Sequence, residues 1–572
     1  MPNLIARLIA RIPLPFRVLY RQFLLRVVDL EALSIQADVP RFLGQFAGVL
    51  IMISCLRALG ALFFPPPPGM AWELEVSALS NMLLVVGLIS VVTWDATFPD
   101  RRDVLALGHL PVRPRTILLA KVSASAGLLA LAMATLNWAS GFVWAVVFGQ
   151  GSILRSLRFF AAFWFTIVAA SLFLYGAVLA LQGIAALLLP RKMFLRFSAI
   201  AQLAAFALFM AVYFLEPSLS SRAQLLDPAN HALLASSPVY WFLALLNQLN
   251  GTLPAEFMWL AQRAWIGLAM VLLGAGTALV LCYVRTMKKT VEEPDLVPGA
   301  GGLHWAPRLG GSLRTAILYF SLRSLVRSRQ HRVVLAFYWS VVLAIALSCF
   351  RSEIAEPTPG AIPSGYLIST FLIMTIAVFG LRNVCALPIS LNANWVLRIT
   401  QLRQPEKYFA GTRSLFLLLG VLPALLVTVV LGWRLNPWQQ VAAHLVLLFL
   451  LGCFFVEIAL LKFQKVPFTC SYLPGKANVQ IVFWGAVFVI SLLSITVALY
   501  EQKVLHDPGH DAGMLAALAA GAGTLWLINR HRAQYAELYF EEVAPEIILT
   551  LGLSTGMRYE PIGPGPKSAG TT

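Results

Sequence analysis

The chain has 572 residues, of which 59% are hydrophobic and only 12% are charged, and its mean hydropathy is +0.78. A chain this apolar cannot cover soluble domains with polar groups, which excludes a soluble protein, a disordered chain and a collagen-like fibre. The net charge of +17 does not require a nucleic acid, because lysine and arginine collect in the cytoplasmic loops of membrane proteins. The composition therefore predicts a polytopic membrane protein without a nucleic-acid partner.

Apolar runs long enough to cross a bilayer as helices recur along the whole chain. If both termini are cytoplasmic, most of the 43 lysine and arginine residues fall on the inner side, as the positive-inside rule requires. The sequence thus predicts an all-α transmembrane bundle of about twelve spans, arranged in two pseudo-repeated halves of six. The predicted spans are residues 43–64, 75–96, 117–148, 157–189, 196–215, 263–284, 333–350, 365–387, 411–433, 438–462, 477–499 and 511–529.

A long polar stretch with a glycine-rich end divides the predicted spans into these two halves. Such a composition is typical of a linker, and its position among the spans makes it cytoplasmic. The predicted parts are a first half at 1–284, the linker at 285–313, a second half at 314–529 and a cytoplasmic tail at 530–572.

Each half opens with a basic amphipathic segment, at residues 5–30 and 314–331. Arginines four residues apart, such as Arg323 and Arg327, alternate with apolar and aromatic residues. That pattern suits a helix that lies in the inner-leaflet interface beside anionic lipid headgroups. The alternative is a solvated helix that merely precedes a span.

The loop between the second and third predicted spans combines charges, leucines and prolines in a distinctive order. It predicts a short amphipathic helix with its leucines toward the bundle, a turn at a proline, and the basic start of a long span. Its mixed charges suit a protein partner better than an anionic membrane surface, which favours purely basic segments. The residues are Asp100, Arg101, Arg102, Asp103, Leu105, Leu107, Leu110, Pro111, Val112, Arg113 and Lys121.

This order resembles the coupling segment of type-2 ATP-binding-cassette (ABC) exporter permeases. Those permeases carry an acidic start, a leucine-rich short helix, a Pro-Val turn, a basic residue and a lysine near the start of span 3. The resemblance implies a permease in the bacterial inner membrane that exports a lipid-like, peptide or drug-like substrate and binds a separate ATPase subunit. The matching residues are Asp103, Leu105, Leu110, Pro111, Val112, Arg113 and Lys121.

The two halves differ where the resemblance is most specific. The equivalent loop of the second half, 392–408, lacks the Pro-Val turn, and its last outer loop is short. The first half instead has a long outer segment, 216–262, whose aromatic stretch 238–245 we expect at the outer membrane interface. The sequence leaves open whether both halves couple to an ATPase.

No nucleotide-binding or catalytic motif occurs in the sequence. The single Gly-Lys pair, Gly475-Lys476, lacks the other positions of a phosphate-binding loop, so we expect no cofactor here and ATP hydrolysis in a partner subunit. A secondary transporter is the alternative function, although such carriers usually need several intramembrane acids or broken helices. A membrane-embedded lipid-modifying enzyme is a weaker alternative, because it needs a clustered catalytic constellation.

Three further features carry open interpretations. Glu457, predicted in the middle of the span 438–462, either lies on a substrate or proton path or is a carboxyl protonated or paired for packing. Arg57, in the first span, is similar but has a side chain long enough to snorkel outward. The outer loop 506–511 holds two histidines and two aspartates, which form either a divalent-metal site or simply a polar hairpin.

Overall fold

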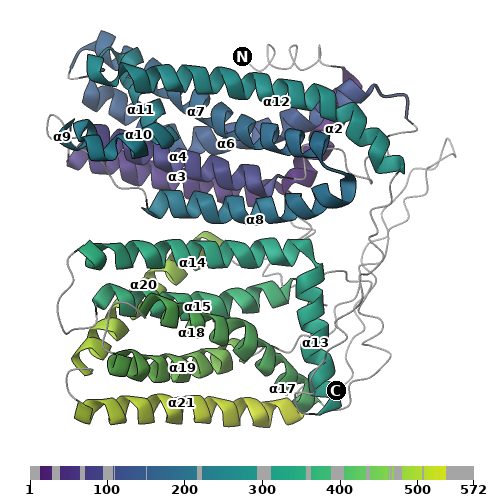
Figure 1. Cartoon of the computed structure of the whole chain (residues 1–572), viewed down its shortest axis with the longest axis vertical. Helices are drawn as coiled ribbons and strands as arrows, with labels where there is room; N and C mark the ends of the chain where they lie inside the picture. Colours follow the sequence, from purple (N-terminus) through teal and green to yellow (C-terminus); the bar gives the residue numbers. More distant parts are fainter. Residues whose placement is uncertain are drawn as a thin grey trace, which may run out of the picture.

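The chain folds into helices alone in the part that the structure, a computed structural model, describes (Figure 1). No strand occurs among those residues, which confirms that the fold is all-α, as predicted. The described residues are 13–28, 39–64, 71–94, 107, 110–149, 151–215, 222–292, 311–355, 363–387, 405–432, 438–461, 463, 467–468, 479–504 and 508–535.

Eight helices in this part of the chain are long and apolar enough to cross a membrane, or nine if one bent pair counts as a span. A membrane-embedded helical bundle is thereby supported, whereas the count of twelve spans stays a prediction. The helices at the predicted fifth and seventh spans contain only shorter apolar stretches, Ile200–Phe214 and His331–Ala346. The eight are Leu43–Phe63, Trp72–Val92, Pro114–Phe148, Ile153–Leu188, Ala255–Cys282, Ser364–Ala386, Pro405–Gly432 and Trp438–Leu460.

The first group of helices runs from α2 to α12 and occupies the upper part of Figure 1. Its helices α7 and α12 approach closely, because a Cβ atom at Gly183 would lie only 2.4 Å from the Cβ atom of Ala278. Small residues bring helix backbones together in this way. The bounds are α2 (Leu14–Val28), α3 (Val39–Phe63), α4 (Ala71–Val92), α6 (Pro114–Phe148), α7 (Ile153–Leu188), α8 (Arg191–Leu215), α9 (Arg222–Leu226), η2 (Pro228–Asn230), α10 (His231–Ser236), α11 (Pro238–Asn250), η3 (Ala255–Phe257) and α12 (Met258–Glu292).

The second group runs from α13 to α21. Its first helix, α13, lies across the ends of the long helices in Figure 1, as expected of an interfacial helix. A π-helical turn, η5, joins α17 to α18 just before Pro423, which cannot donate a backbone hydrogen bond to the preceding turn. The bounds are α13 (Ser312–Arg327), α14 (Arg329–Ala355), α15 (Ser364–Ala386), α17 (Pro405–Phe416), η5 (Leu417–Val421), α18 (Leu422–Gly432), α19 (Trp438–Leu460), α20 (Val479–Val504) and α21 (Pro508–Tyr535).

Corresponding helices make corresponding contacts in the two groups. The amphipathic helix that opens each group packs on the third long helix, as α2 on α6 and α13 on α17. The second long helix packs on the fourth and fifth, and the fourth packs on the sixth, in both groups. The first long helix differs, because α3 packs on α6 whereas α14 packs on α15. The two groups therefore share most of one packing plan.

The two groups meet through their first and fifth long helices. Helix α8 packs extensively on α14, where the rings of Phe206 and Phe337 lie 5.7 Å apart. The reciprocal pair, α3 and α20, touches only slightly. In each pair the first long helix of one group meets the fifth of the other, which is the pattern of an approximate twofold axis between the groups.

Candidate functional site

Figure 1 gives the bundle two distinguishable ends, which we call the α13 end, where α2 and α13 lie, and the α11 end, where α9, α10 and α11 lie. Most of the predicted coupling segment lies outside the described residues. This applies to Asp100, Arg101, Arg102, Asp103 and Leu105. The described remainder, Leu107 and residues 110–121, belongs to the α13 end.

Leu107 and Val112 attach this remainder to the bundle. Both pack against a small apolar cluster formed by Leu19 and Phe23 of α2 and by the first turns of α6. Leu110, in contrast, is 44% exposed, so the prediction that it faces the bundle is wrong. The chain turns at Pro111, and Val112 rather than Leu110 then fills the place beside α2.

The basic residues of the segment lie in two different environments. Arg113 is exposed and has the extended backbone expected before Pro114, the first residue of α6. Lys121 is only 3% exposed, and its ammonium group lies 5.3 Å from the centroid of the Phe23 ring. Lys121 thus joins the start of α6 to α2 through a cation–π contact.

Glu457 lies at the same end of the bundle, in the last turn of α19. The prediction that it occupies the middle of a span is wrong, because α19 ends three residues later at Leu460. Arg413 of α17 binds its carboxylate with both ends of the guanidinium, at 2.5 Å from Nε to Oε1 and 3.0 Å from Nη2 to Oε2. Asn529 of α21 donates to Oε2 and to the backbone oxygen of Glu457, both at 2.8 Å.

This cluster is a paired carboxylate that ties three helices together, which agrees with the packing interpretation of Glu457. Bidentate arginine–carboxylate pairs are strong and geometrically specific. A place for Glu457 on a substrate path stays a prediction.

Arg413 occupies nearly the same position in its group as Lys121 does in the first group. Helices α6 and α17 each begin with a proline, Pro114 and Pro405, and the basic residue follows seven or eight positions later. This correspondence was not predicted from the sequence, where the second loop was distinguished by its lack of a Pro-Val turn. The helix-starting proline was the signal that would have revealed it.

A second buried polar cluster, on α15, α19 and α20, was also missed. The Nδ1 atom of His444 lies 2.5 Å from Oε1 of Glu501, and its Nε2 atom lies 2.9 Å from the hydroxyl of Thr370. A hydroxyl, an imidazole and a carboxylate in this order match the arrangement of an activated nucleophile. However, Thr370 is fully buried and its hydroxyl also contacts the backbone oxygen of Tyr366 at 2.9 Å. The cluster therefore links helices and offers no exposed nucleophile.

Helix α11 contains the aromatic stretch predicted at the outer membrane interface, and its depth in a membrane stays a prediction. Helices α10 and α11 meet at an angle of 92°, so α11 turns back and packs against α4, α7 and α12. Its residues Phe242 and Leu245 are fully buried. The bend therefore places apolar side chains of α11 inside the first group, where they contact other helices.

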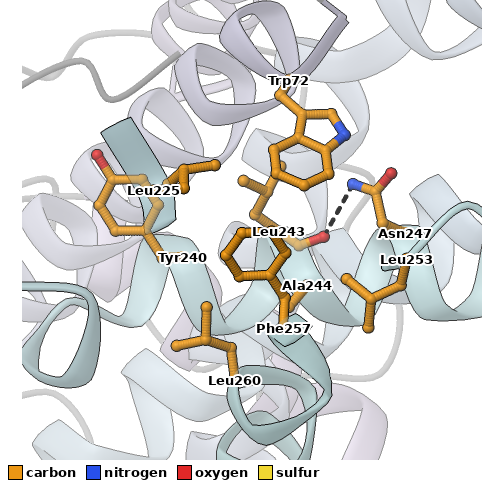
Figure 2. Close-up of a pocket in the computed structure, with 9 residues that line it drawn as sticks. All are labelled: Trp72, Leu225, Tyr240, Leu243, Ala244, Asn247, Leu253, Phe257 and Leu260. Atoms are coloured by element: carbon orange, nitrogen blue, oxygen red, sulfur yellow. Dashed lines mark hydrogen bonds between the residues drawn. The ribbon is translucent and has the colours of Figure 1, made fainter. Parts of the chain in front are cut away.

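A small apolar pocket lies beside α11 (Figure 2). Asn247 supplies an amide to its wall, and Nδ2 of this amide donates to the buried carboxylate of Glu75 on α4 at 2.8 Å. Thr252 donates to the amide oxygen at 2.7 Å. Because the Asn247 amide group is hydrogen-bonded to these protein partners, it offers no free polar group to the pocket, which is therefore apolar. The lining residues are Trp72, Leu225, Tyr240, Leu243, Ala244, Asn247, Leu253, Phe257 and Leu260.

Arg57 of α3 also lies toward the α11 end. Its guanidinium lies over the ring of Trp144 on α6, 5.0 Å from the centroid. Both Nη atoms are shielded from solvent and have no hydrogen-bond partner within the described part of the chain. Of the two interpretations left open, the structure shows the guanidinium held against α6 by the ring of Trp144, with both Nη atoms shielded from solvent.

The described side chains include no group of three or more histidines, cysteines, aspartates or glutamates that fits a metal ion. The predicted alternative at 506–511 is not settled by this, since the side chains of that loop lie outside the described residues.

Compared with profiles of known protein families, with curated proteins and with solved structures, this chain has no match.

Proposed function

We propose that this chain is the transmembrane permease of an ATP-driven exporter of the ABC type, with ATP hydrolysed by a separate subunit. The observation that carries the proposal is the attachment of the loop ahead of α6. Leu107 and Val112 pack against an apolar cluster whose members come from α2 and from the start of α6. A loop held on two helices at once transmits a displacement by a partner into the bundle, which is the task of a coupling segment.

The packing plan shared by the two groups of helices supports the proposal that two permease halves are joined in one chain. Repeated halves around an axis are common among transporters. In this proposal the α13 end faces the cytoplasm of a bacterial cell, both termini lie inside, and the α11 end faces outward. The lipid-like, peptide or drug-like nature of the cargo follows from the family resemblance alone.

A secondary transporter is the second candidate, because the structure buries two acids, Glu75 and Glu501, in addition to the Glu457 singled out in the sequence. Glu75, Glu457 and Glu501 are each no more than 5% exposed. Buried intramembrane carboxylates are typical of ion-coupled carriers. Each of the three nevertheless hydrogen-bonds to a neighbouring side chain, Asn247, Arg413 and His444 respectively, as in a structural role.

The experiment that tests the permease proposal is purification of the chain from its own cells in mild detergent, with measurement of the co-purifying ATPase. Reversing the charge of Arg101 and Arg102 together should remove most of the ATPase and abolish transport, while membrane insertion stays normal. The matched control reverses Arg398 and Arg403 in the second half, whose loop lacks the Pro-Val turn, and should do less.

A second variant separates coupling from binding. Leu107→Ala removes one of the two anchors of the loop, leaving Val112, and should reduce transport while the ATPase still co-purifies. Unchanged co-purification and transport in the Arg101/Arg102 variant would overturn the coupling assignment. Transport that persists without any ATPase but collapses when an ionophore dissipates the proton or sodium gradient would favour the secondary transporter.

A further inference from the structure

The guanidinium of the partly buried Arg57 has no compensating anion among the described residues. Its two Nη atoms have no solvent contact and no hydrogen-bond acceptor. The ring of Trp144, 5.0 Å from the guanidinium carbon, supplies a cation–π contact, which offsets only part of the cost of burying a charge. An arginine buried in this state needs an acceptor that the described chain does not provide.

The neighbouring polar groups are also donors or are already engaged. The indole N–H of Trp144 is fully buried and has no acceptor. Tyr213 lies close enough to Arg57 to interact with it electrostatically, and its hydroxyl donates to Asn81 at 2.8 Å. The site thus combines one positive charge and two kinds of unused N–H donor, which is the complement of an oxyanion.

We propose that Arg57 and Trp144 bind the anionic group, a phosphate or a carboxylate, of an amphiphile. The position of the site supports an amphiphile because α3 lies at the edge of the first group. Leu56, next to Arg57 in the chain, and Leu59, on the same face of α3 as Leu56, are 58% and 47% exposed. An acyl chain lying along this apolar face of α3 would place its head group beside the guanidinium. The inference rests on the proposed function, for which it names the class of substrate.

Two other acceptors in the chain are less suitable partners for Arg57. The amide oxygen of Asn137 is buried and unpartnered, but Asn137 precedes Trp144 by two turns of α6, about 10 Å along the helix. Glu216 follows α8 in the sequence and lies outside the described residues. The test below includes Glu216, because a structural ion pair between it and Arg57 would replace the proposed ligand.

The test measures thermal stability and ligand binding of the purified full-length chain in neutral detergent. Phosphatidylglycerol, the anionic probe, should raise the Tm of the wild-type protein, whereas phosphatidylcholine with the same acyl chains should not. Arg57→Gln should weaken the apparent affinity for phosphatidylglycerol about tenfold or more, the loss expected for a charge-assisted hydrogen bond. Trp144→Phe, which keeps the ring but removes the N–H, should weaken it less.

Arg263→Gln is the matched control. Arg263 also lies 5.0 Å from a tryptophan ring, that of Trp259, but its Nη1 atom donates to the backbone oxygen of Ala235 at 2.7 Å. The response to phosphatidylglycerol should survive this change. Without lipid, Arg57→Gln should not lower the Tm, because it removes an unpaired buried charge.

The other possible results of these binding and stability measurements each support or overturn the proposed anion site. A phosphatidylglycerol response that persists in Arg57→Gln, or an equal response to phosphatidylcholine, overturns the proposal. A loss of Tm without lipid that Glu216→Gln reproduces also overturns it, in favour of an ion pair. If inorganic phosphate alone produces the shift and Arg57→Gln removes it, the anion site is upheld and the amphiphile is rejected. None of these measurements depends on an ATPase. The anion-site proposal can therefore be overturned without affecting the permease proposal, which the co-purification experiment tests.

Discussion

Replacing Glu457 by leucine should destabilise the second group of helices far more than a typical surface change. The substitution removes the only acid that contacts Arg413 among the described residues and one of the two acceptors of the Asn529 side-chain amide, which keeps the backbone oxygen of residue 457. The side chain of Glu457 is 6% exposed and that of Arg413 is 20% exposed. Leucine therefore leaves a mostly buried guanidinium without its counter-ion.

Removal of one partner of a buried ion pair costs about 3–5 kcal/mol, and the partial exposure of Arg413 places this case near 3 kcal/mol. If the second group unfolds as one unit, about 2–4 °C per kcal/mol predicts a fall in Tm of about 6–12 °C. Glu457→Gln retains one acceptor for the guanidinium and should cost about 1–2 kcal/mol. The double variant Glu457→Leu/Arg413→Leu should recover most of the loss, because a buried pair replaced by apolar side chains is often nearly neutral.

The assay is unfolding of the four proteins in detergent, followed by tryptophan fluorescence, with transport measured on the same samples. A matched control is Glu406→Leu, since Glu406 lies on α17 but is exposed. If Glu457→Leu loses no more stability than this control, the ion pair between Arg413 and Glu457 does not stabilise the second group of helices. If the double variant regains stability but not transport, Glu457 acts on the substrate path as well.

Two further predictions concern topology and the second buried cluster. The topology test uses a chain whose native cysteines are replaced. Ala229→Cys near α10 should react with a membrane-impermeant maleimide added outside intact cells, whereas Ser312→Cys at the start of α13 should react only after permeabilisation. The reverse pattern would invert the proposed orientation. His444→Phe leaves the buried carboxylate of Glu501 without its hydrogen-bond partner and should lower the free energy of unfolding by about 3–5 kcal/mol. Glu501→Gln keeps an acceptor and should lower it by about 1–3 kcal/mol. Equal losses of stability for the two variants in detergent would contradict the pairing.

The sequence predicted the elements of the fold well where one local signal determines them. Helix α6 begins at Pro114 and runs without a break to Phe148, because a proline starts the helix and the following apolar run has no interruption strong enough to end it. The amphipathic helices α2 and α13 follow from arginines spaced four apart. Such signals depend on residues near one another in the chain.

Side-chain partners could not be predicted in the same way. Glu457 bonds to residues 44 and 72 positions away, and His444 bonds to Glu501, 57 positions away. These pairs depend on the packing of α17, α19, α20 and α21, which no local pattern encodes. The bend before α11 is a similar case, because its apolar stretch suits a membrane interface and a protein interior equally well.

The buried cations at the two helix starts suggest why the halves need not couple alike. In the first half, Lys121 links α6 to α2 through the ring of Phe23, so movement of the loop beside α2 reaches α6 directly. In the second half, Arg413 links α17 to α19 through Glu457, and Asn529 adds α21. A displacement of the second loop would therefore move three long helices together, against a buried ion pair. For this reason we expect the first half to respond more readily to an ATPase and the second half to act as the stiffer side of the bundle.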